Sequence, residues 1–245
     1  MTDAAFEVIR PELPSRWLVT CDHARNDVPA WINGGGLGLS ADQMARHIAY
    51  DIGAAGVTRH LATKLNATAV LSTFSRLVID PNRGEADPTL VMRVSDGAII
   101  PANRHIDAAG KEERLKRLYR PYHQAYADAA AARDDTVICA VHSFTPHMQG
   151  RPPRPWEVGI LYADDDRLAR PFIVACEAAG WCVGDNEPYI GYFPGDAIDR
   201  HATPAGRPNI LIELRQDLIA DEASQALWAG RLAPILIESL AATGL

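Results

Sequence analysis

Two histidines in this sequence follow apolar segments of the kind that form buried strands. His23 comes shortly after the apolar run at residues 17–20, and His142 ends a second apolar run that begins at residue 137. In open α/β sheets, ligands bind just beyond the carboxyl ends of the strands, so we expect these two side chains to meet at one site. A single histidine in such a place is more often a hydrogen-bonded core or loop residue, but two in matching positions favour a metal site.

A catalytic zinc ion usually has three protein ligands and an open position for water. For the third ligand the sequence offers Asp51, Asn26 and Asp22. A charged oxygen binds zinc better than a neutral amide, which favours Asp51 over Asn26 despite the close His-x-x-Asn spacing. We expect one helix over residues 41–65, opened by a capping box of Ser40 and Gln43, to present Asp51 toward the strand ends. The prediction is therefore one Zn²⁺ ion, bound by the two histidines and Asp51.

Glu213 is a carboxylate within an otherwise apolar run at residues 209–214. Burying an unpaired carboxylate is costly. Glu213 is therefore expected either to pair with a neighbour such as Arg215 or to act as a general base on a metal-activated water.

A loop at residues 75–83 supplies Arg76, Asn82 and Arg83. Arginine binds carboxylates through two parallel hydrogen bonds, so this loop suits a small anionic substrate. The alternative is that Arg76 packs in the core and Arg83 is solvated. Among the remaining histidines we favour His201, because it lies in the long loop before the Glu213 strand.

Phosphate binding by a glycine-rich loop and serine hydrolysis are disfavoured, because the sequence lacks the motif that each requires. The glycines at residues 34–36 are not followed by the Lys-Ser/Thr of a phosphate-binding loop. Ser143 lacks the Gly-x-Ser-x-Gly turn of serine hydrolases.

Composition limits the remaining possibilities. The chain has 245 residues, 47% of them hydrophobic, which suits one domain over residues 1–245. Its net charge of −7 argues against a nucleic-acid partner. The sequence contains no run of about 18 apolar residues, so we expect a protein that does not enter the membrane. It has no export signal, and we expect its four cysteines to be reduced thiols, as in a cytoplasmic protein. The oligomeric state is left open.

Expected strands alternate with expected helices along most of the chain. The strands are predicted at residues 17–20, 67–72, 76–79, 137–142, 158–162, 181–184 and 209–214. Besides the helix at 41–65, helices are predicted at residues 111–133, 166–179 and 222–240. This alternation predicts an α/β fold in which a mostly parallel sheet is covered by helices on both faces.

The sequence resembles the N-formylglutamate amidohydrolase family over nearly the whole chain, through six motifs that occur in the family's order. They are Cys-Asp-His-Ala-Arg-Asn at 21–26, His-Ile-Ala-Tyr-Asp-Ile-Gly-Ala at 47–54, Ser-Arg-Leu-Val-Ile-Asp-Pro-Asn-Arg at 75–83, His-Ser-Phe-Thr-Pro at 142–146, Asp-Asn-Glu-Pro-Tyr at 185–189 and Ile-Glu-Leu-Arg-Gln-Asp-Leu at 212–218. The resemblance implies a zinc-dependent hydrolase with a zinc-exopeptidase-like fold, a three-layer helix/sheet/helix arrangement around a mixed twisted sheet.

The resemblance also implies roles for individual residues. His23 and His142 would bind the metal, Glu213 would be the base, and Asn82 with Arg83 would bind a substrate carboxylate. One motif departs from the family, because its His-x-x-Glu is His23-x-x-Asn26 here. Asp51 is therefore our replacement for the acidic ligand.

The expected reaction is hydrolysis of the formyl amide of an N-formyl amino acid, with N-formyl-L-glutamate as the leading substrate and histidine degradation as the setting. The alternatives are deacylation of another N-acyl amino acid or small peptide amide, and metal-free binding of a small acidic ligand. Substrate binding is assigned to Arg76, Asn82, Arg83, Arg215, Asn26 and His201.

Overall fold

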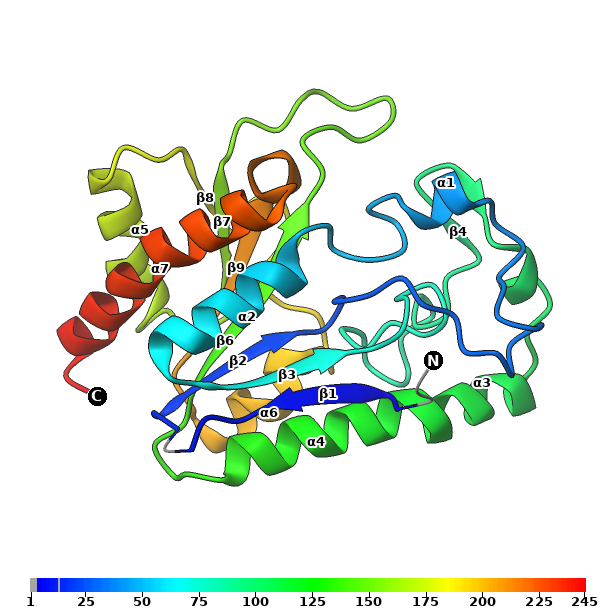
Figure 1. Ribbon diagram of the computed structural model, residues 1–245, viewed down its shortest axis with the longest axis horizontal. Helices are drawn as coiled ribbons and strands as arrows, with labels where there is room; N and C mark the ends of the chain where they lie inside the picture. The colour runs from blue at the N-terminus through cyan, green and yellow to red at the C-terminus, as the bar shows by residue number, and fades with distance from the viewer. Residues whose placement is uncertain (1–3, 13) are drawn as a thin grey trace.

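A mixed sheet of seven strands runs through the centre of the computed structural model, which describes residues 4–12 and 14–245 (Figure 1). The strands lie in the order β1-β3-β2-β6-β9-β7-β8. Their bounds are β1 Phe6–Ile9, β2 Trp17–Cys21, β3 Thr68–Ser72, β6 Val137–Phe144, β7 Val158–Leu161, β8 Val183–Asp185 and β9 Asn209–Arg215. The two remaining strands, β4 Val94–Ser95 and β5 Ala98–Ile99, form a separate hairpin.

The four central strands β3, β2, β6 and β9 are parallel to one another. At one edge β1 pairs with β3 in the antiparallel sense, and on the other side β7 runs antiparallel to β9. Strand β8 is parallel to β7. The prediction of a mostly parallel mixed sheet is therefore confirmed.

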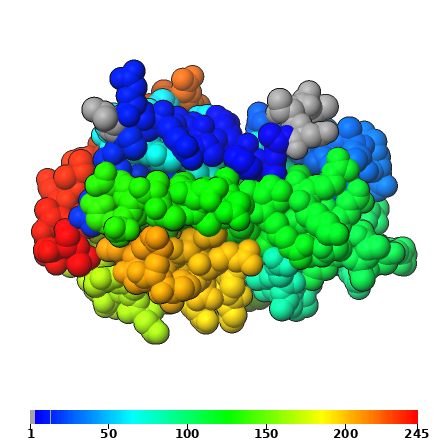
Figure 2. Space-filling view, turned by 90° about the horizontal axis from the view of Figure 1, so that it is seen from below, coloured from blue at the N-terminus to red at the C-terminus, as the bar shows by residue number. Residues whose placement is uncertain are grey.

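Helices cover both faces of the sheet, as expected for a three-layer α/β fold (Figure 1). One face is covered by α2 Ala54–Leu65, α5 Ala169–Ala178 and α7 Glu222–Thr243. The other is covered by a π-helical turn at Leu115–Tyr119 and α4 Arg120–Ala131, which continue α3 Ala108–Arg114. Figure 2 shows this helical segment, in green, between the N-terminal segment and the region around α6 Ala197–His201. Within the described residues, no helix combines the length and apolarity needed to cross a membrane.

The alternation of side chains along β6 decides which way its histidine points. Val137, Cys139 and Val141 pack in the hydrophobic cluster beneath α2, α5 and α7. Ile138 and Ala140 pack in the cluster on the α4 side. Because side chains alternate between the two faces of a strand, the next even-numbered residue, a histidine, points to the α4 side of the sheet as well.

The predicted helix over residues 41–65 is wrong, because the structure divides it. The capping box of Ser40 and Gln43 is present, but it opens a helix of only one turn, α1 Ala41–Met44. The chain is then irregular until Gly53, which has a φ of 83° and precedes α2. A Cβ on Gly53 would collide with the backbone carbonyl of Ile219, so this turn needs glycine for space as well as for conformation.

Two further elements differ from the expectation. Residues 76–79, predicted as a strand, form turns instead. The stretches between predicted elements at residues 80–110 and 185–208 contain the β4–β5 hairpin, helix α6, and 3₁₀ turns at Pro101–Asn103 and Thr203–Ala205. A last 3₁₀ turn, Gln216–Ile219, joins β9 to α7.

Candidate metal and substrate site

His23 and His142 lie side by side at the carboxyl ends of β2 and β6. Their ring centroids are 5.0 Å apart, and the rings meet at 77°. Both side chains are buried, with exposed fractions of 1% and 2%. Strands β2 and β6 are parallel neighbours, and so residues just beyond and just before their ends share one edge of the sheet.

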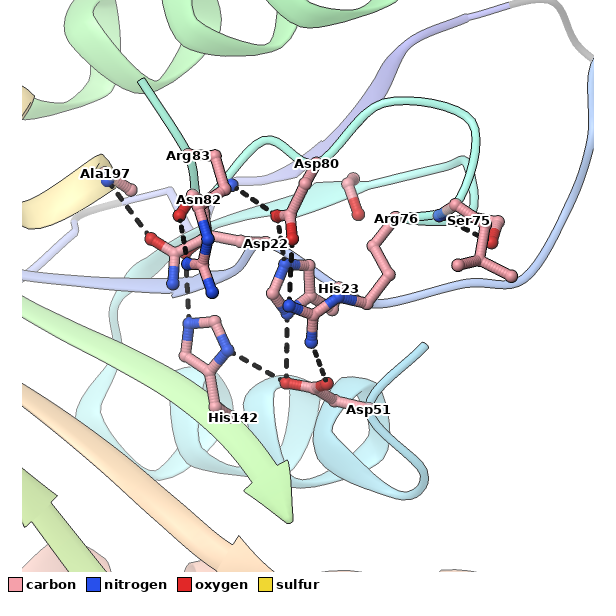
Figure 3. A network of polar contacts seen from close by, with 12 residues as sticks. Asp22, His23, Asp51, Ser75, Arg76, Asp80, Asn82, Arg83, His142 and Ala197 are labelled. Atoms are coloured by element: carbon pink, nitrogen blue, oxygen red, sulfur yellow. Dashed lines mark hydrogen bonds and ion pairs between the residues drawn. The ribbon is translucent and has the colours of Figure 1, made fainter. Parts of the chain in front are cut away.

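Asp51 completes a cluster with the two imidazoles (Figure 3). Its Oδ2 lies 3.3 Å from Nδ1 of His23 and 2.8 Å from Nδ1 of His142. One ligand atom from each of the three residues lies within 4.8 Å of the others. The carboxylate comes from the irregular segment before α2, where the backbone N–H of Asp51 donates to the carbonyl of His23 at 2.9 Å. The expected residue is thus in place, but a loop and not a helix face positions it.

The outer nitrogen of each imidazole donates to a further carboxylate. Nε2 of His23 lies 2.6 Å from Oδ1 of Asp80, and Nε2 of His142 lies 3.1 Å from Oδ2 of Asp22. Metal-binding histidines commonly donate their second ring N–H to a carboxylate, which fixes the ring and leaves the other nitrogen free to coordinate. Both Nδ1 atoms are therefore oriented toward one point, and this donor set of two nitrogens and a carboxylate oxygen fits zinc.

Charge compensation holds the buried carboxylates Asp51 and Asp80 in their ionised forms. Burial alone would raise the pKa of Asp51, but the charge of His23 and the hydrogen bond from His142 hold it well below its usual range. Burial opposes the charges at Asp80 too, where the Arg76 guanidinium keeps the carboxyl pKa low. For His142, burial lowers the pKa, and the hydrogen bonds to Asp22 and Asp51 outweigh it and raise the pKa.

Glu213 lies on β9 directly opposite His142. Its side chain is only 6% exposed, and among the described residues its Oε2 has no hydrogen-bond partner. Burial raises the pKa of Glu213 to about 7, against the opposing charge of His142. A carboxyl group with such a pKa can both accept and donate a proton near neutral pH.

These side chains open into a cavity with about 950 Å³ of space, its open mouth included. Arg76, Asn82 and Arg83 line it together with His23, Asp51, His142 and Glu213. Its apolar lining includes Met92, Met148, Leu161, Ile190 and Phe193. This size and lining are typical of a site for a small molecule with a few polar groups.

The arginines of the 75–83 loop play different structural roles. Arg76 donates to Asp80 at 2.8 Å and to Asp51 at 3.4 Å, so its charge is matched by two buried carboxylates. Arg83 has no such match among the described residues: its Nη1 donates to the carbonyl of Asn82, and its guanidinium lies 4.4 Å from the ring centre of Phe193. Arg83 can therefore receive an anionic ligand.

Three residues predicted for substrate binding lie outside this cavity. The Asn26 amide donates to the carbonyl of Met44 at 2.8 Å, because the chain turns it toward α1. Arg215 pairs with Asp217 at 2.8 Å. His201 is buried against α4 and lies 2.9 Å from a second histidine, His123.

Sequence reasoning missed Asp80, which is fully buried and contacts both His23 and Arg76. A signal was available, because Asp80 is an acidic residue at the end of the apolar run 77–79 and therefore needs a partner. Tyr122 was missed too; its hydroxyl donates to Asp22 at 2.5 Å from helix α4. No local sequence pattern predicts that contact, because the tertiary fold determines which face of α4 packs on the sheet.

Residues 15–220 match the family model described as N-formylglutamate amidohydrolase. In structure the chain is similar to gene product Atu2144 from Agrobacterium tumefaciens, with a TM-score of 0.91 and 36% sequence identity over 98% of this chain and 96% of that one. It is also similar to the N-formylglutamate amidohydrolase from Ralstonia eutropha JMP134, with a TM-score of 0.71 and 20% identity over 96% of both chains. No curated protein matches this chain in sequence.

Proposed function

Because this chain belongs to the N-formylglutamate amidohydrolase family, we propose that it is a zinc-dependent enzyme that cleaves the formyl amide of N-formyl-L-glutamate. Water is the second reactant, and the products are formate and L-glutamate. The bond that breaks joins the formyl carbon to the amino-acid nitrogen.

One observation carries the proposal. Nδ1 of His23 and Nδ1 of His142 converge on the same carboxylate oxygen of Asp51, while the other nitrogen of each ring is held by a separate carboxylate. A structural ion-pair network would not need two imidazoles with matched orientation beside Glu213, a buried residue whose Oε2 has no hydrogen-bond partner among the described residues.

His23, His142 and Asp51 would hold the metal. Zinc bound there would polarise the formyl carbonyl and make the attacking water more acidic. Glu213 would take a proton from that water and return it to the nitrogen as the carbon–nitrogen bond breaks. Its raised pKa supports both steps, since the group can change protonation state near neutral pH.

The neighbouring polar groups would orient the substrate. Arg83 would bind a substrate carboxylate, and Asn82 would hold the arginine loop in place, because its Oδ1 accepts from the backbone N–H of Ala197 at 3.2 Å. Arg76 would keep Asp51 and Asp80 ionised, and thereby keep the two imidazoles aligned.

The test combines metal content with substrate turnover. The purified protein should retain one zinc ion per chain and release formate from N-formyl-L-glutamate. A chelator should abolish the activity, zinc should restore it, and His142→Ala should lose both metal and activity. A folded, active protein without stoichiometric metal would overturn the zinc assignment. Faster turnover of N-acetyl or N-succinyl amino acids would overturn the formyl assignment.

A further inference from the structure

A substrate with two carboxylates needs two cationic groups that are free to receive them. Arg76 and Arg83 are the arginines that line the described cavity, and Arg76 is already matched by Asp51 and Asp80. Arg215 lies outside and pairs with Asp217. The cavity lining thus supplies one available guanidinium, Arg83, for a substrate with two charges.

Arg154 is a second available guanidinium, and it contacts three residues that line the same cavity. Its Nη1 donates to the carbonyl of Thr145 at 3.2 Å and to the hydroxyl of Tyr189 at 3.1 Å, and its Nη2 lies 3.1 Å from the sulfur of Met148. These three partners are neutral, and all three line the cavity. Among the described residues no carboxylate forms an ion pair with Arg154, so this half-buried cation is uncompensated.

The position of Arg154 relative to the site is fixed by β6. Its backbone N–H donates to the carbonyl of Pro146 at 2.8 Å, only a few residues beyond His142 on the same segment. The loop that carries it extends beyond the carboxyl end of β6 (Figure 1). Tyr189, whose hydroxyl accepts from Arg154, lines the same cavity as Glu213.

We propose that Arg154 binds the side-chain carboxylate of the substrate and Arg83 binds its α-carboxylate. Arg154 would then determine specificity for N-acyl derivatives of acidic amino acids. The inference rests on the proposed function, because it assumes that the substrate lies in this cavity. The planar guanidinium can exchange its neutral partners for a carboxylate, to which charge-assisted hydrogen bonds are stronger.

The experiment compares N-formyl-L-glutamate with N-formyl-L-glutamine, which has nearly the same shape and no side-chain charge. Arg154→Ala should lower kcat/KM for the glutamate substrate roughly ten- to a hundredfold, the usual effect of losing a hydrogen bond to a charged group. Turnover of the glutamine substrate should be nearly unchanged. Arg151→Ala is the matched control, since it removes the same charge from an exposed position in the same loop.

Binding measurements separate this inference from the proposed function. Calorimetry on Glu213→Gln, with and without Arg154→Ala, should show tighter binding of N-formyl-L-glutamate than of N-formyl-L-glutamine only when Arg154 is present. This result would support the inference even if the wild type hydrolysed neither compound. The inference would be overturned if Arg154→Ala lowered kcat/KM equally for both substrates, or if Arg151→Ala had the same effect as Arg154→Ala. It would also be overturned if Glu213→Gln with Arg154 intact bound the two compounds equally well.

Discussion

Glu213 and His142 are direct neighbours across the parallel strands β9 and β6, and both side chains point to the α4 side of the sheet. Residues in register on adjacent parallel strands keep a fixed separation, because the ladder of backbone hydrogen bonds on both sides holds them. On the proposed mechanism, Glu213 would therefore need no loop movement to reach a water beside His142.

The first prediction concerns Glu213→Gln. Amide for carboxylate preserves shape, so zinc content and thermal stability should stay close to those of the wild type. Turnover of N-formyl-L-glutamate should fall by about 10²–10⁴, the usual contribution of a positioned acid–base group. Formate release under saturating substrate measures the change. Near-normal turnover would give Glu213 a purely structural role.

A second prediction distinguishes Asp51 from Asn26 as the acidic position. Asp51→Ala should abolish zinc retention, because its Oδ2 is the oxygen toward which both imidazoles point. Asn26→Ala should retain zinc, because the Asn26 side chain donates to the carbonyl of Met44. Metal analysis after dialysis decides the matter, and retention by Asp51→Ala with loss from Asn26→Ala would reverse the assignment.

Tyr122 gives a third prediction, with Tyr126 as its control. The Tyr122 hydroxyl donates to Asp22, which also accepts from His142. Tyr126 lies one turn further along α4, and its hydroxyl accepts from the hydroxyl of Thr20. Tyr122→Phe should weaken zinc binding about tenfold, as expected for one lost hydrogen bond to a charged group that orients a ligand. Tyr126→Phe should not change it. Competition with a chromogenic chelator measures both, and equal effects would mean a general loss of packing.

The fourth prediction concerns stability in acid. Burial lowers the pKa of His123 to about 3 and that of His201 to about 4. Unfolded histidine titrates near about 6.5, so between about pH 6.5 and 4 the unfolded chain binds protons that the folded chain does not. These residues therefore make the protein less stable as the pH falls through that window, and have no such effect above it.

Denaturant unfolding at pH 7.5 and pH 5 checks this effect. The stability difference between the two pH values should be smaller in His201→Gln than in the wild type. Exposed His105 offers a control, and His105→Gln should retain the wild-type difference. An unchanged pH dependence in His201→Gln would mean that other groups cause the acid sensitivity.

Local patterns were sufficient to predict much of the fold and part of the site. Buried strands have continuous apolar runs, which is why β2, β6 and β9 were found close to their true bounds. His23, His142 and Glu213 follow from those strands, because parallel strands bring their carboxyl ends to one edge. The six motifs made the family recognisable, and the match over residues 15–220 confirms it.

Other features depend on contacts between distant segments, which no local pattern contains. Helical spacing continues through residues 45–53, but the hydrogen bond from the Asp51 backbone to His23 and the close approach of Gly53 to Ile219 require a break there. Residues 76–79 have the apolar, β-branched composition of a strand, yet they turn so that Arg76 and Asp80 can meet the site. His201 was chosen for its place in a loop, and the structure packs it against α4.

The antiparallel direction of β7 separates the strands that carry His142 and Glu213 from the connection that carries Arg154. Because β7 runs antiparallel to β9, the chain that leaves the carboxyl end of β6 re-enters the sheet from that same end. The connection therefore needs no helix that crosses the sheet. Residues 145–157 can therefore change in length or sequence while β2, β6 and β9 keep their register. On the proposed roles, selectivity would be free to diversify in this connection while His142 and Glu213 keep their places on β6 and β9.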